Sequence, residues 1–163
     1  MEKIKKFEKK MIKQLNYYNV DVLYNKCARN YVLKNGLKIN PKTYRGFIDI
    51  DSYFKDPDKK IYILIFNTKS KFVYGTIAHE FKHAEQLLNG RIQPDTDKGK
   101  FKCEIEAYKA GMIELSKQGV WISVIYALKS VGGLINSFYR YKITSIFKRN
   151  RRWFFYKSFW SIY

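Results

Sequence analysis

The sequence predicts an α+β domain in which a small sheet packs against helices. Three observations support this fold class. Apolar residues recur at helical spacing in residues 73–89 and 100–117, whereas β-branched and aromatic runs between residues 46 and 66 have the pattern of strands. The 163 residues suffice for one hydrophobic core, and a hydrophobic content of 46% is typical of a folded chain.

The N-terminal part begins with an amphipathic helix over residues 2–18. Its apolar side chains lie at helical spacing among lysines, at Ile4, Phe7, Met11 and Leu15. Further along, Asn35-Gly36 separates two short apolar runs, which predicts a hairpin turn. Pro41 ends that unit.

Two strands are expected next. Residues 46–54 alternate isoleucine with aspartate, the period-two pattern of a half-exposed strand. A turn at Asp56-Pro57-Asp58 follows, and residues 61–66 form a short apolar run suited to a more buried strand. We expect these two strands to pair and to form an antiparallel or mixed sheet.

Two longer helices complete this unit. The first spans residues 73–89 and is ended by Gly90, after which comes a loop containing Pro94. The second spans residues 100–117 and is followed by Gly119. We therefore assign residues 1–118 to one domain.

The remaining residues, 119–163, form a C-terminal extension. Residues 119–138 are long and apolar, but Lys129 and Gly132-Gly133 favour a packed or interfacial helix over a membrane span. Residues 139–163 are basic and aromatic. The sequence thus predicts a helical, basic and aromatic extension of the domain.

The charge of the chain predicts anionic partners. The formal net charge is +18, and residues 115–163 contain nine of the 32 lysines and arginines but none of the 14 acidic residues. In residues 139–163 the cations are interleaved with aromatic rings, which suits single-stranded nucleic acid as well as an anionic membrane surface. The apolar segment directly upstream favours the membrane surface.

The N-terminus and the cysteines predict a cytoplasmic protein. The first ten residues are basic, but no apolar segment of a secretory signal follows them. Cys27 and Cys103 are the only cysteines and form no C-x-x-C pair. We expect two buried thiols in a reducing compartment, with membrane association through the extension.

The only two histidines, His79 and His83, stand four residues apart in an H-E-x-x-H sequence with Glu80. On a helix this spacing brings both imidazoles to one face, within reach of one ion. They point away from the apolar stripe that is expected to meet the sheet. The pattern therefore favours a metal site over a core histidine pair or a coincidence on a solvated surface. The apolar stripe comprises Ile77, Phe81, Ala84 and Leu88.

A catalytic zinc site takes three protein ligands and leaves one position open. Because the chain has no third histidine, a carboxylate must complete the set. Glu104 and Glu106, on the helix of residues 100–117, are the main candidates, and Asp95 and Asp97 are further ones. Glu104 shares a helix face with small residues that leave room for a close approach by the histidine helix, at Ala107 and Gly111.

The motif and the order of elements over residues 46–117 resemble the zincin metallopeptidases. Glu104 begins an E-x-x-A sequence twenty-one residues after His83, which looks like the second helix of ImmA/IrrE-type and CAAX-protease-like glutamate zincins. The resemblance implies that Glu104, rather than Glu106, is the third ligand. Those families often have an aspartate after the alanine. Here Tyr108 stands at that position, either as a hydroxyl donor or as core packing.

The resemblance implies zinc-dependent hydrolysis of a peptide bond. Zn²⁺ held by His79, His83 and Glu104 would acidify its water, and Glu80 would take the proton as general base. The strand of residues 61–66 would border the cleft and hold an extended protein or peptide substrate on an unpaired edge. The alternative is a non-enzymatic basic module that binds nucleic acid or anionic membrane and carries a structural or vestigial metal site.

Overall fold

The structure is a computed structural model that describes residues 1–92 and 99–138. Its helices and strands confirm the predicted α+β class. The elements are α1 (Glu2–Leu15), β1 (Val20–Tyr24), α2 (Asn25–Lys34), β2 (Gly46–Asp49), α3 (Ile50–Lys55), β3 (Ile61–Ile65), α4 (Val73–Leu88), α5 (Lys100–Ser116) and α6 (Val120–Phe138).

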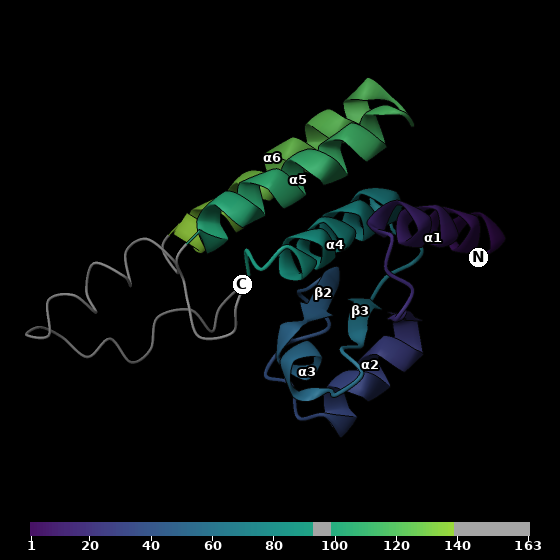
Figure 1. The fold of residues 1–163 in the computed structure, drawn as a ribbon. Coiled ribbons are helices and arrows are strands. Elements are labelled where there is room, and N and C mark those ends of the chain that lie inside the picture. The colour runs from purple at the N-terminus through teal and green to yellow at the C-terminus, as the bar shows by residue number, and fades with distance from the viewer. Residues whose placement is uncertain (93–98, 139–163) are drawn as a thin grey trace, which may run out of the picture.

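Helix α4 lies between two layers (Figure 1). The sheet and α1 pack on one side of it, and the antiparallel pair of α5 and α6 lies on the other side. The apolar stripe of α4 faces the sheet, with Ile77, Phe81 and Ala84 buried against the isoleucines of β3. Each fully buried large apolar side chain stabilises such packing by about 1.5–3 kcal/mol.

The three strands form a mixed sheet in the order β1-β3-β2. Strand β2 pairs antiparallel with β3, as predicted, and β1 pairs parallel with the other edge of β3. Strand β3 is therefore central. Its side chains alternate between the α4 side of the sheet, with Ile63, and the α2 side, with Leu64.

The central position of β3 corrects one expectation. An unpaired edge was expected along residues 61–66, but both edges of β3 are paired within the described residues. The third strand, β1, consists of the residues VDVLY, where alternation over five positions is too short to stand out. Strands β1 and β2, which each pair only with β3 among the described strands, are the edge strands instead.

Asn35-Gly36 does not form a hairpin turn. These residues end α2, whose Ala28 and Val32 are buried at helical spacing. Gly36 adopts a positive φ of 62°, and the backbone N–H of Leu37 donates to the carbonyl of Val32 at 3.1 Å. This hydrogen bond is typical of a helix that ends at a glycine. Such a helix end and a tight hairpin both require a residue in the left-handed backbone conformation.

The strand expected over residues 46–54 is shorter than predicted. Asp49 ends β2 and caps α3, because its side chain accepts a hydrogen bond from the backbone N–H of Ser52 at 3.0 Å. Aspartate fits the polar positions of an alternating strand, but it is also one of the preferred residues at a helix N-cap. The chain consequently turns into α3 at Ile50.

Helices α4 and α5 approach closely through two glycines. A Cβ atom added to Gly111 would lie 2.8 Å from the carbonyl oxygen of Gly75, and one on Gly75 would lie 3.1 Å from that of Gly111. Real Cβ atoms do not tolerate the shorter of these distances. The small residues on this face of α5 therefore allow α4 to approach closely, as the sequence predicts.

The apolar segment of the extension forms α6, which packs on α5 (Figure 1). Its Tyr126 is buried against Phe72, with the ring centroids 5.9 Å apart. Within the described ranges, no helix is long and apolar enough to cross a membrane. The basic and aromatic tail of residues 139–163 lies outside the described residues.

The cysteines differ from expectation in one respect. Cys103 is buried on α5, but Cys27 is exposed on α2, and neither forms a disulfide. Cys27 falls on the outer face of α2 because Ala28 and Val32 are the positions that meet the sheet.

Candidate metal centre

Helices α4 and α5 bring three potential metal ligands together. The Nε2 atoms of His79 and His83 lie 3.1 Å apart. One carboxylate oxygen of Glu104 lies 3.7 Å from His79 Nε2, and the other lies 3.5 Å from His83 Nε2. The three donor atoms lie within 4.8 Å of one another.

Both histidines are buried, with 9% of His79 and 7% of His83 exposed. The alternative of two histidines on a solvated helix surface is therefore wrong, because α5 and α6 cover the face of α4 that points away from the sheet. Burial and, to a smaller extent, the neighbouring His83 lower the pKa of His79 to about 3. His79 is therefore neutral, and its buried Nδ1 atom has no hydrogen-bond partner in the described part of the chain.

The carboxylate of Glu104 has the opposite effect on His83. Burial disfavours the charged imidazole, but the hydrogen bond and negative charge of Glu104 outweigh burial and raise the pKa of His83. Three electron-pair donors thus converge on one small region, an arrangement that calls for a cation among them. Two imidazole nitrogens and a carboxylate suit zinc in a site with an open position.

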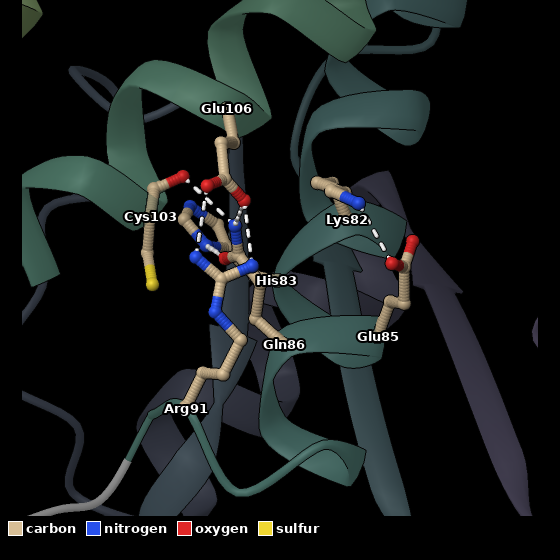
Figure 2. A network of polar contacts seen from close by, with 7 residues as sticks. All are labelled: Lys82, His83, Glu85, Gln86, Arg91, Cys103 and Glu106. Carbon is tan, nitrogen blue, oxygen red and sulfur yellow. Dashed lines mark hydrogen bonds and ion pairs between the residues drawn. The ribbon is translucent and has the colours of Figure 1, made fainter. Parts of the chain in front are cut away.

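A buried amide holds His83 in its orientation (Figure 2). Gln86 is fully buried, and its amide nitrogen donates to the carbonyl of Cys103 at 3.1 Å and to Glu106 at 3.2 Å. With both donors directed at acceptors, the Gln86 oxygen must accept from His83 Nδ1, 2.9 Å away. The Nδ1 atom therefore carries the proton, and Nε2 presents its lone pair to the centre.

Glu106 anchors this amide and lies apart from the centre. The guanidinium of Arg91 donates to its two oxygens at 2.7 and 2.8 Å, as Figure 2 shows. These hydrogen bonds hold the pKa of Glu106 at about 2. The structure thus brings Glu104, and not Glu106, to the histidines. Asp95 and Asp97 lie outside the described residues.

Gln86 and Arg91 were not singled out from the sequence. The available signal was the position of Gln86, three residues after His83 and hence on nearly the same helix face. The position of Arg91, beyond the end of α4, gives no comparable signal.

Glu80 lies beside the centre under the start of β2. Only 6% of the residue is exposed, and a Cβ atom added to Gly46 would lie 2.7 Å from its carboxylate. Glycine at position 46 therefore lets the edge strand pass directly over Glu80. Burial raises the pKa of Glu80 to about 8, with a smaller contribution from Glu104 and an opposing one from His83.

A cleft of about 680 Å³ opens over these residues. Its walls come from residues 43–48, at and before β2, and from α4, α5 and α6, and the two histidines, Glu80 and Glu104 are among its lining residues. The strand that borders the cleft is thus β2. The expectation that residues 61–66 do so is wrong, because β2 covers that edge of β3.

Tyr108 and Tyr126 also line the cleft. The ring of Tyr108 packs against that of His79, with their centroids 4.5 Å apart, and Tyr126 follows from α6. Burial raises the pKa of Tyr108 to about 12, and the carboxylates of Glu104 and Glu80 add to the effect. Tyr108 is therefore a neutral phenol that packs on a candidate ligand and also faces the cleft.

No protein family, curated protein or solved structure matches this chain. The functional argument accordingly rests on the geometry of the centre and the cleft.

Proposed function

We propose that the protein is a zinc-dependent metallopeptidase in which His79, His83 and Glu104 hold the metal. One observation carries the proposal. The Nε2 atoms of the two histidines and the carboxylate of Glu104 converge in a cleft, next to the buried carboxylate of Glu80. Three ligands of these types suit a zinc ion that keeps a position for substrate or water.

Zinc, when bound, would supply a Lewis acid that polarises the scissile carbonyl and makes water a better nucleophile at neutral pH. The protein's own part is proton transfer and positioning. Glu80 takes the proton of the attacking water and passes it to the leaving amine. Burial of the Glu80 carboxyl favours its protonated form, which suits a group that holds a proton between the two steps.

The cleft suits an extended peptide. Strand β2 pairs with β3 along one edge, and no described strand pairs with its other edge. A substrate lying in the cleft can add to β2 as a further strand, so that backbone hydrogen bonds fix the scissile bond near Glu80. Gly46 keeps the strand close to the reacting groups.

The test combines metal analysis with an unbiased cleavage assay. Purified protein supplemented with zinc is analysed for metal content and incubated with a proteome, with Glu80→Gln as the matched control. We expect one zinc ion per chain in both proteins and new peptide termini only with the wild type. A wild type without bound transition metal contradicts the metal site. Bound zinc with no cleavage that depends on Glu80 contradicts the peptidase and favours a structural zinc site in a basic binding module.

A further inference from the structure

Arg45 lines the cleft that contains the proposed general base. It is the residue before Gly46, whose backbone passes over Glu80. Its side chain is partly buried and lines the cleft, and its guanidinium lies 4.8 Å from the centroid of the Phe72 ring. Stacking on an aromatic face fixes a guanidinium without using its hydrogen-bond donors.

The charge of Arg45 is not neutralised within the described part of the chain. Across residues 1–92 and 99–138, Arg45 forms no ion pair. Among the described residues, the acidic side chains that line the cleft are Glu80 and Glu104, and both belong to the proposed centre. Lys38 also lines the cleft, so the described lining carries positive charge beside Arg45.

We propose that Arg45 forms a carboxylate-binding subsite, so that the preferred substrates are peptides with a carboxylate close to the scissile bond. The inference rests on the proposed peptidase function. A guanidinium presents paired N–H donors that match the two oxygens of a carboxylate, and a partly buried wall strengthens the contact. The carboxylate comes either from an Asp or Glu side chain or from the C-terminus of the peptide.

The subsite is tested by binding, because binding does not require turnover. Zinc-loaded Glu80→Gln protein is titrated with a peptide library in which each position carries Asp, Glu, Asn or Gln, with free or amidated C-termini. We expect at least one position at which an acidic residue binds about tenfold more tightly than its amide, the effect of one charge-assisted pair. If the carboxylate is instead the C-terminus of the peptide, the tenfold difference appears between free and amidated C-termini.

Variants then assign the preference to Arg45. In the Glu80→Gln background, Arg45→Gln abolishes the acidic preference, and Arg45→Glu turns it toward lysine-containing peptides. Arg29→Gln removes the same charge from the exposed surface of α2 and leaves the preference unchanged. Zinc content is measured in every variant to show that the centre is intact. An absence of acid-dependent binding, or an acidic preference that survives Arg45→Gln, overturns the inference.

Failure of the peptidase proposal has a different signature. If wild-type protein binds zinc and cleaves no member of the library, the catalytic proposal fails. The Glu80→Gln titrations still report whether a carboxylate binds at Arg45. If the wild type cleaves peptides without regard to acidic residues, the peptidase stands and the subsite fails.

Discussion

At the scale of single residues, the proposed metal centre depends on side chains that would not themselves ligate the metal. The lone pair of His83 Nε2 points at the centre because Gln86 accepts the proton on the other ring nitrogen. Gln86 is itself held by Cys103 and Glu106, so one substitution disturbs several hydrogen bonds. Ligand orientation in this site is therefore a property of the hydrogen-bond network as much as of the ligands.

Replacing Gln86 tests this network. Gln86→Leu keeps the volume but removes the acceptor for His83 Nδ1, and we expect zinc affinity to fall about 10- to 100-fold. Competition with a chromophoric chelator measures the affinity. Gln118→Leu, at an exposed position after α5, is the matched control. An unchanged affinity in a folded Gln86→Leu protein shows that His83 needs no support from the amide.

Glu104 and Glu106 of α5 are expected to differ in their effect on zinc binding. Glu104→Gln removes a carboxylate that lies within 3.7 Å of both histidines, so it should cause the larger loss of zinc affinity. Glu106→Gln removes the partner of Arg91 and acts on the metal only through Gln86. Measuring both affinities decides the third ligand. A larger loss in the Glu106 variant contradicts the assignment of Glu104.

Glu106 also predicts a change in acid stability. Arg91 lowers the pKa of this carboxylate from an ordinary 4.5 to about 2 in the folded protein. A depressed pKa contributes stability above the ordinary value, and this is lost as the pH falls from about 4.5 toward 2. The melting temperature of wild type should thus fall faster over this interval than that of Glu106→Gln, as followed by circular dichroism. Parallel melting curves contradict a stabilising Arg91–Glu106 pair.

At the scale of elements, glycines set the distance between the parts of the site. Gly75 and Gly111 bring α4 and α5 together, and Gly46 brings β2 onto Glu80. Each of the three elements thus packs against a neighbour at a position where a side chain would not fit. The position of Glu104 relative to the histidines follows from this close packing of α5 on α4.

Gly111→Ala tests the helix contact. The new Cβ atom would lie 2.8 Å from the backbone oxygen of Gly75, so the helices must separate. We expect a loss of about 1–3 kcal/mol in unfolding free energy, together with weaker zinc binding. Gly132→Ala is the control, because it meets nothing within 4 Å and should be neutral or stabilising. A Gly111→Ala protein with wild-type stability and zinc affinity would show that the contact is dispensable.

The sequence predicts the long elements better than the short ones. Helices α4 and α5 have sustained periodicity, and Gly90 ends α4 with the positive φ that only glycine adopts readily. Strand β1 is too short for alternation to be distinctive. Asn35-Gly36 and Asp49 are ambiguous locally, because a helix end and a hairpin both use Asn-Gly, and a strand and an N-cap both use Asp. Tertiary packing resolves these cases.

The same division applies to the candidate centre. His79, Glu80 and His83 are predictable because their geometry is set within one helix. Glu104 can be predicted from the helix face that it shares with small residues. Arg45 could not be predicted in this way. Its position depends on how strand β2 lies over α4, and no local sequence pattern encodes that packing.

At the scale of the whole molecule, the proposed site and the basic extension meet at α6. The inner face of α6 supplies Tyr126 to the cleft, while Trp121, Leu128 and Ile135 on the helix are 78%, 69% and 52% exposed. These three side chains recur every seven residues and so lie along one helix face. In the sequence, this exposed apolar row is followed by a segment rich in cations and aromatic rings, and the two together have the composition of a membrane-binding surface.

We therefore expect the protein to sediment with anionic liposomes at low salt. Deleting residues 139–163 removes seven of the cations and should abolish sedimentation while leaving zinc content unchanged. Serine at Trp121, Leu128 and Ile135 should weaken binding in the full chain, because apolar contact then no longer adds to charge attraction. Neutral liposomes are the control for charge. Full-length protein that ignores anionic liposomes but binds single-stranded nucleic acid with a steep salt dependence would assign the extension to nucleic acid instead.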